Sequence, residues 1–180
     1  MKKVILAGYM GSGKSATAQI LQQITGFELI NLDRLIEQKA GLSVNDIFKK
    51  KGEMYFRKLE HESLKDCLVL DQNAILDLGG GTPCYYNNMK LILASDTISF
   101  YLKTSIATLQ SRLDREHFSR PLLKNCSSLE LTEFIAKHLF ERRPYYEMCN
   151  HTVTTDDKSP ALIADAIASI LREEGVIPVS

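Results

Sequence analysis

"LAGYMGSGKSAT", residues 6–17, matches the pattern G-x-x-x-x-G-K-[ST] at Gly8, Gly13, Lys14 and Ser15. Glycines let consecutive backbone N–H groups approach phosphate oxygens, and the helix that follows such a loop presents its positive end. Lys14 can reach the β- and γ-phosphates, and the Ser15 hydroxyl can ligate Mg²⁺. The stretch therefore predicts a loop that holds a nucleoside triphosphate. A glycine-rich turn that only caps a helix is the alternative.

Strand and helix patterns alternate along the rest of the chain. Short apolar, β-branched runs predict five strands, at 2–8, 27–32, 73–79, 97–103 and 151–155. Helical spacing occurs at 14–24, 34–50 with a break at Gly41, 53–70, 86–94, 105–114, 129–148 and 159–173. This alternation predicts a parallel sheet with helices on both faces and with ligands at the carboxyl ends of its strands. The irregular segment 114–128 is expected to be a mobile loop, with a plain surface connection as the alternative.

Composition and charge narrow the class of protein. The 180 residues are 44% hydrophobic and 24% charged, which is typical of one globular domain spanning 1–180. The 22 basic and 22 acidic residues cancel, so no overall positive field favours nucleic acid or an anionic membrane. The first apolar run is too short for a secretory signal, and none approaches the ~20 residues of a membrane span. Four scattered cysteines without a C-x-x-C pair suit buried thiols in a reducing compartment, so we expect a cytoplasmic protein. Its net charge of zero, its modest size and the lack of an obvious surface apolar stripe predict a monomer.

A triphosphate can be used in three ways: transfer to a small molecule, hydrolysis as a timing switch, or binding as a structural or regulatory module. "DLGG" at 77–80 has the D-x-x-G spacing of a GTPase switch, but the chain contains no N-K-x-D segment to read guanine. The switch is therefore disfavoured.

Residues from four parts of the chain suit a second, acidic substrate: Asp33, Arg57 with Glu60 at i, i+3, the glycines 79–81 and Arg142. Each has a plain structural alternative, namely a helix cap for Asp33, a helix-face ion pair of Arg57 with Glu60, a tight turn, and a solvated helix end. Together they favour a hydroxylated carboxylic acid. Arginine forks bind carboxylates, an aspartate can orient a hydroxyl or accept its proton, and glycines let a ring approach the backbone.

At this point the chain resembles the shikimate kinases over nearly its whole length. The motifs that carry the resemblance are "GYMGSGKSA" (8–16), "DRLIE" (33–37), "GLSVNDIF" (41–48), "GEMYFRKLE" (52–60), "GGGTP" (79–83), "RPLL" (120–123) and "RRPYYE" (142–147). The resemblance implies an α/β, three-layer α/β/α P-loop kinase fold with a five-stranded parallel sheet, a substrate-binding helical segment near 33–60 and a mobile lid at 114–128. It also implies ATP-dependent phosphorylation of the 3-hydroxyl of shikimate, on the way to chorismate and the aromatic amino acids. A gluconate kinase and a nucleotide-binding module without turnover remain as rivals.

The resemblance also implies residue roles. Shikimate would be bound by Asp33, Arg57, Gly79, Gly80, Gly81 and Arg142. ATP would be bound by Gly11, Ser12, Gly13, Lys14, Ser15, Ala16, Arg112 and Arg120. Catalysis would depend on Asp33, Lys14 and the lid residue Arg120, with Ser15 on Mg²⁺. Arg115 is a rival to Arg112 for stacking on adenine, and Asp157 and Pro160 would lie near the other side of the adenine pocket.

One position departs from the family pattern. Where the family usually reads D-x-D, this chain has Asn31-Leu32-Asp33, so the carboxylate that helps to hold Mg²⁺ through water is an amide. An amide accepts a hydrogen bond but brings no charge. Magnesium is therefore expected to bind more weakly or to depend more on Ser15 and the phosphates, and Asp77 is a candidate to compensate.

Overall fold

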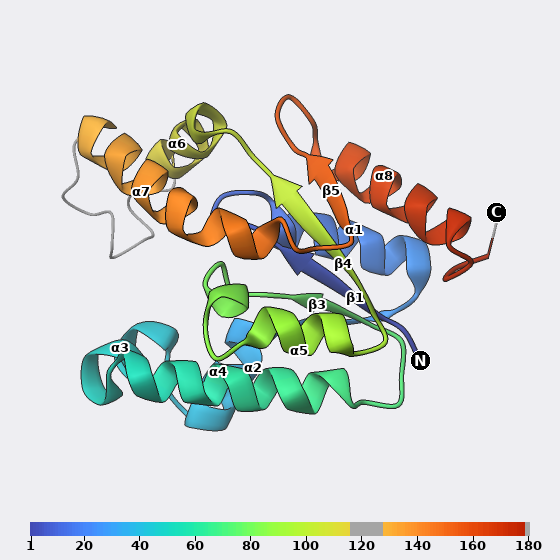
Figure 1. Cartoon of the computed structure of the whole chain (residues 1–180), viewed down its shortest axis with the longest axis horizontal. Coiled ribbons are helices and arrows are strands. Elements are labelled where there is room, and N and C mark those ends of the chain that lie inside the picture. Colours follow the sequence, from blue (N-terminus) through green and yellow to red (C-terminus); the bar gives the residue numbers. More distant parts are fainter. Residues whose placement is uncertain (116–127, 179–180) are drawn as a thin grey trace.

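The structure, a computed structural model, describes residues 1–115 and 128–178. A sheet of five parallel strands runs through the centre of this part of the chain (Figure 1). The strands are β1 (Lys3–Ala7), β2 (Glu28–Asn31), β3 (Ala74–Asp77), β4 (Thr97–Lys103) and β5 (His151–Thr154), in the order β2-β3-β1-β4-β5. All five match the apolar runs in the sequence, so the predicted parallel sheet is confirmed.

Helices follow every strand, and β1 leads through the 8–13 loop into α1. Their bounds are α1 (Lys14–Thr25), α2 (Leu32–Ala40), α3 (Val44–Lys51), α4 (Glu53–Leu68), α5 (Asn88–Ala94), α6 (Ile106–Arg115), α7 (Ser128–Tyr146) and α8 (Pro160–Glu173), with a short 3₁₀ helix, η1 (Thr82–Cys84). Each of the eight α-helices overlaps a predicted helical segment, and only η1 was not foreseen.

The core lies in two layers, one on each face of the sheet. Val4 and Leu6 of β1 join a cluster with α1 and α8, whereas Ile5, between them, joins the cluster of α2, α4 and α5. This alternation follows from the two-residue period of a strand, and β1 is buried along its whole length. Figure 1 shows α1 and α8 together beside the sheet, with α2, α4 and α5 on the other side. The predicted three-layer arrangement is therefore confirmed. Because β1 is packed between both layers of helices, the start of the phosphate loop at its end is held in place.

The break in the 34–50 segment and the start of α2 have local causes. Gly41 ends α2 with a φ of 64°, a left-handed conformation that glycine adopts without strain. The side chain of Asn31 caps α2, because its Oδ1 accepts a hydrogen bond from the backbone N–H of Arg34 at 2.9 Å. The alternative in which Asp33 caps this helix is therefore wrong, and Asp33 lies in the first turn with its side chain available for other contacts.

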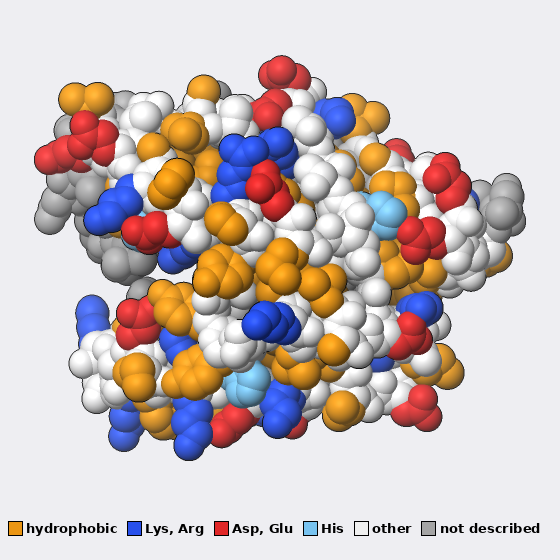
Figure 2. All heavy atoms as spheres, in the orientation of Figure 1, with side chains coloured by type: hydrophobic (Ala, Val, Ile, Leu, Met, Phe, Trp, Pro, Cys, Tyr) orange, Lys and Arg blue, Asp and Glu red, His pale blue; other side chains and the backbone are white. Residues whose placement is uncertain are grey.

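Helices α6 and α7 form a third apolar cluster beside the sheet, in which Leu109 and Leu113 of α6 pack with Leu131 and Ile135 of α7. On the face shown in Figure 2, a notch separates this part of the surface from the part around α3 and α4, and basic and acidic side chains are interspersed. Residues 116–127, most of the expected 114–128 lid with Arg120, lie outside the described residues.

Two further expectations concern thiols and membranes. Cys67 is buried, whereas Cys84 and Cys149 are only half-buried, and all three are free thiols. None of the helices described combines the length and the apolar character that a bilayer span requires.

Candidate functional site

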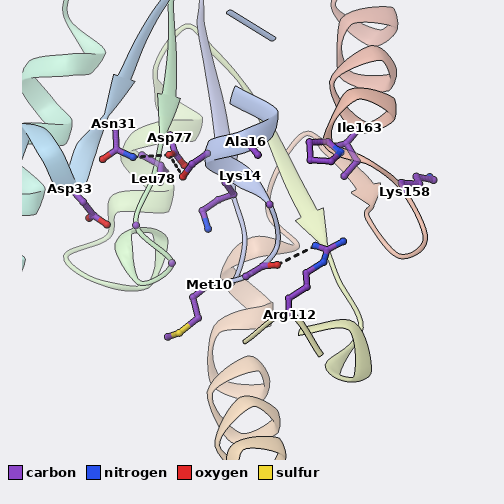
Figure 3. A pocket seen from close by; sticks show the side chains of 16 residues that line it. Met10, Lys14, Ala16, Asn31, Asp33, Asp77, Leu78, Arg112, Lys158 and Ile163 are labelled. Carbon is purple, nitrogen blue, oxygen red and sulfur yellow. Dashed lines mark hydrogen bonds between the residues drawn. The ribbon is translucent and has the colours of Figure 1, made fainter. Parts of the chain in front are cut away.

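A cavity of about 560 Å³ opens at the carboxyl ends of β1 and β3. Its lining comes from four regions: the phosphate loop (Met10, Gly11, Gly13, Lys14, Ser15, Ala16), the end of β2 and the start of α2 (Asn31, Asp33), the end of β3 (Asp77, Leu78, Gly79, Gly80) and the α6 and α8 side (Arg112, Lys158, Pro160, Ile163). Figure 3 shows Lys14 between Asp33 on one side and Arg112 on the other. The cavity thus joins residues predicted for ATP to residues predicted for the acid.

The phosphate loop is built by backbone geometry. Gly13 precedes α1 with a φ of 93°, and no side chain caps this helix, so its first N–H groups are open to an anion. The buried ammonium of Lys14 donates to the carbonyl oxygens of Gly8 at 2.9 Å and Tyr9 at 3.1 Å, which holds it over the loop. Ser12 is buried, and its N–H donates to the Tyr9 carbonyl at 3.1 Å, so it shapes the loop without lining the cavity.

One end of the cavity combines the apolar side chains of Pro160 and Ile163 with basic ones, a lining that suits a nucleobase. Arg112 of α6 donates to the carbonyl oxygens of Gly11 at 3.1 Å and Thr155 at 3.2 Å, and thereby ties the phosphate loop to the end of β5. Pro160 and Ile163 line the same end, whereas Asp157, in the turn before α8, does not line the cavity. The side chain of Arg115, the rival candidate, lies outside the described part of the chain.

Asp33 stands at the other end. Its burial, with the negative charges of Glu60, Asp77 and Glu37, raises the pKa of this carboxyl from 3.8 to about 6, against the opposing effect of Lys14. The absence of a side chain at Gly79 permits this position, since a Cβ there would lie 2.9 Å from Asp33 Oδ1. A carboxylate with such a pKa is ionised at neutral pH and still accepts a proton more readily than an exposed aspartate.

Arg57 is held by a buried network. It donates to Glu60 Oε2 at 2.9 Å and to Glu53 Oε1 at 3.3 Å, and its guanidinium lies 3.9 Å from the centroid of the Tyr85 ring. Glu60, which is fully buried, also accepts a hydrogen bond from Thr82 Oγ1 at 2.6 Å. The helix-face ion pair considered from the sequence does form, but inside the protein. There it anchors an arginine next to the glycine turn.

Gly80 and Gly81 follow Gly79 in the glycine turn and lie against the phosphate loop and Arg57, respectively. A Cβ on Gly81 would lie 2.8 Å from both terminal nitrogens of Arg57, and one on Gly80 would lie 3.3 Å from the backbone nitrogen of Met10. The hydroxyl of Tyr146, on α7, donates to the Gly80 carbonyl at 2.5 Å. The glycine turn therefore brings Arg57 and the phosphate loop to opposite sides of one backbone segment.

Arg142 lies half-buried on α7, with its guanidinium 5.7 Å from the centroid of the Tyr9 ring. Arg57, Gly81 and Arg142 do not line the 560 Å³ cavity. The two arginines nevertheless converge on Cys84: burial raises the pKa of this thiol to about 11, and both positive charges oppose the increase. They therefore bring two guanidinium groups from α4 and α7 toward one region beside the glycine turn.

Three residues of this region were not predicted from the sequence as site residues: Thr82, Tyr85 and Tyr146. Thr82 and Tyr85 closely follow the glycine triplet, which is a signal that could have indicated them. No local pattern distinguishes Tyr146 from the adjacent Tyr145.

The donor set at the start of α1 fits a hard divalent cation. The hydroxyl of Ser15 donates to Asp77 Oδ2 at 2.6 Å, and the Asn31 amide nitrogen donates to the same oxygen at 2.7 Å (Figure 3). Within residues 1–115 and 128–178 there is no group of three or more His, Cys, Asp or Glu side chains that could form a complete metal cage. Oxygen donors beside a phosphate loop suit Mg²⁺, which usually takes few protein ligands and shares its shell with phosphates and water.

Known proteins match this chain along most of its length. A sequence model described as shikimate kinase matches residues 10–172. Shikimate kinases of Flavobacterium psychrophilum and Flavobacterium johnsoniae are 48% and 50% identical, over 95% and 88% of this chain and 99% and 92% of those proteins. The crystal structure of the Bacteroides thetaiotaomicron shikimate kinase (27% identical; 97% of this chain, 98% of that one) aligns with a TM-score of 0.87. The structure of the Acinetobacter baumannii shikimate kinase in complex with shikimate is 27% identical, covers 96% of this chain and 93% of its own, and aligns with a TM-score of 0.84. The chain therefore belongs to the shikimate kinase family and has its P-loop kinase fold.

Proposed function

We propose that this chain transfers the γ-phosphoryl group of ATP to the 3-hydroxyl of shikimate, giving shikimate 3-phosphate and ADP. The observation that carries the proposal is that one cavity places Lys14 and the open start of α1 beside Asp33 and the glycine turn. The family membership and a relative's structure in complex with shikimate support the same acceptor.

The acceptor is held by groups of complementary charge. Arg57 and Arg142 bind its carboxylate, and Gly79, Gly80 and Gly81 let the ring approach the backbone. Asp33 then meets the 3-hydroxyl and orients it or accepts its proton as the oxygen attacks phosphorus. The raised pKa of Asp33 supports the second role, because a base with a pKa near 6 is ionised at neutral pH and is a stronger proton acceptor than a free aspartate.

The donor lies along the phosphate loop. Gly11, Gly13, Lys14, Ser15 and Ala16 surround the phosphates, Ser12 shapes the loop that holds them, and Arg112 lies beside the adenine. Mg²⁺, held by Ser15, neutralises negative charge on the phosphates when it is bound. The protein's own contribution is to align donor and acceptor and to keep charged groups fixed around the transferred group.

An ADP-release assay with shikimate, with gluconate and without acceptor tests the proposal. We expect ADP formation only with shikimate, together with a phosphomonoester product in ³¹P NMR spectra. Turnover with gluconate alone would identify a gluconate kinase, and nucleotide binding without any turnover would identify a binding module.

Adjacent arginines on α7 offer a matched pair of variants. Arg142→Ala is expected to raise the KM for shikimate, as is Arg57→Ala, with little change in the KM for ATP. Arg143 is exposed and donates to Glu147 at 2.6 Å, so Arg143→Ala should leave both constants unchanged. Equal effects of the two α7 substitutions would contradict the assignment of Arg142.

The chain is further proposed to act as a cytoplasmic monomer in a single domain. The free thiols of Cys67, Cys84 and Cys149 suit a reducing compartment, and a net charge of zero gives no drive toward nucleic acid or membranes. Size-exclusion chromatography with light scattering tests the mass: a dimer would contradict this part of the proposal.

A further inference from the structure

The departure at Asn31 has a counterpart on the neighbouring strand. Asn31 ends β2 and Asp77 ends β3, and the two residues are register partners in the parallel pairing of these strands. The residue that lacks the expected charge and the residue that carries an additional one therefore lie side by side, at the edge of the sheet that faces the phosphate loop.

The amide of Asn31 has a fixed orientation. Its Oδ1 accepts from the Arg34 N–H at 2.9 Å, and its Nδ2 donates to Asp77 Oδ2 at 2.7 Å. Exchanging the amide oxygen and nitrogen would set two donors against each other at one end and two acceptors at the other. Asn31 therefore turns its N–H group, not an oxygen, toward the centre of the site, and this geometry is unsuited to a cation ligand.

Asp77 occupies the place that a cation ligand needs. Its residue is 3% exposed, and its Oδ2 accepts both from Asn31 and from the Ser15 hydroxyl, at 2.6 Å. A hydroxyl that donates its proton to a carboxylate keeps its lone pairs for a metal ion. Ser15, Asn31 and Asp77 also line a second cavity of about 860 Å³ next to the first, which gives this point a route for water. Mg²⁺ retains several water ligands, so a site open to water on one side suits it.

We propose that Asp77 supplies the carboxylate of the magnesium site, directly or through one water, and that Asn31 acts as a positioning residue that holds this carboxylate. The negative charge that the family pattern places at the end of β2 has moved to the register partner at the end of β3. The inference rests on the proposed function only in assuming that Mg²⁺ accompanies the nucleotide.

The test measures the effect of Mg²⁺ on ADP affinity, by isothermal titration calorimetry with excess Mg²⁺ and with EDTA. Asp77→Asn should lower the gain in affinity that Mg²⁺ provides by about tenfold or more, and should leave ADP affinity in EDTA unchanged. Asp33→Asn removes another carboxylate from the same cavity and should retain the full gain. An unchanged gain in Asp77→Asn, or an equal loss in both variants, would overturn the proposal.

Two substitutions at Asn31 distinguish the loss of its hydrogen bond to Asp77 from the addition of a negative charge at this position. Asn31→Ser retains a good helix cap but removes the donor to Asp77, and should weaken the magnesium effect several-fold, less than Asp77→Asn does. Asn31→Asp places a second carboxylate at 2.7 Å from the first and should bring no gain over the natural chain, because like charges oppose each other. A clear gain in Asn31→Asp, or an unchanged effect in Asn31→Ser, would overturn the proposal.

The double variant Asn31→Asp/Asp77→Asn exchanges the two side chains and should recover much of the magnesium effect lost in Asp77→Asn. No recovery would overturn the idea that the charge can occupy either member of the pair. If Asp77→Asn does not fold, the two Asn31 variants decide the matter. None of these measurements uses shikimate, so a failure of the proposed acceptor in the turnover assay would leave their outcome distinguishable.

Discussion

The ionised carboxylate of Asp33 should be needed for activity and should lower the free energy of unfolding of the chain. In the unfolded chain its carboxyl ionises near pH 4, whereas in the folded chain burial and three like charges raise its pKa to about 6. Below pH 4 the group is neutral in both states. As the pH rises toward 6 the unfolded state loses its proton first, so the stability of the fold falls, and above pH 6 the full penalty applies. A shift of two units corresponds to at most about 3 kcal/mol.

Asp33→Asn removes this penalty because an amide stays neutral. Without ligands, the free energy of unfolding in urea should exceed that of the natural chain by about 2 to 3 kcal/mol at pH 8, and by about half as much at pH 5. The same variant should lose most of its kinase activity. Exposed Asp71 provides the control, since Asp71→Asn should change stability equally little at both pH values. If Asp33→Asn is no more stable than the natural chain at pH 8, or if its gain in stability does not depend on pH, the carboxylate of Asp33 does not destabilise the fold.

Three more substitutions test the neighbouring contacts. Gly81→Ala puts a methyl group 2.8 Å from the terminal nitrogens of Arg57, on a backbone whose φ of −92° suits alanine, and should lower kcat/KM for shikimate about tenfold in steady-state assays. The same change at Gly41, with nothing within 4 Å, should leave the kinetics unaltered. Glu60→Gln breaks a buried ion pair and should cost about 3 kcal/mol in urea unfolding; a loss below 1 kcal/mol would contradict its buried role. Arg112→Ala should raise the KM for ATP about tenfold while that for shikimate stays constant, and the reverse pattern would reassign this residue.

The fold could be predicted almost completely because its signals are local. Each strand is an apolar run of the right length, and Gly41 and the loop at 8–13 mark where helices end and begin. The 3₁₀ helix Thr82–Cys84 escaped because three residues are too few to show a period. Of the phosphate-loop residues that line the cavity, the sequence pattern named all but Met10, because its spacing reflects one continuous turn of backbone, whereas the predicted Ser12 does not line the cavity.

The parts of the site that the sequence could not supply depend on contacts between distant segments. Asn31 meets Asp77 only through the register of β2 on β3, and no spacing along the chain encodes that register. The link from Glu60 to Thr82 joins a helix to a turn 22 positions later. The sequence did not show which residue caps α2, because Asn31 and Asp33 are both residue types that favour this position, and the structure places Asn31 there.

The glycine turn has a practical consequence for anyone designing an inhibitor. Residues 79–81 offer a compound only their backbone, and a substitution cannot remove a peptide group. Resistance at these positions would require adding a side chain, yet a Cβ at either end of the turn collides with Asp33 or Arg57. Under the proposed function, a variant that escapes an inhibitor in this way would also bind shikimate less well, so resistance at the glycine turn is expected to be rare.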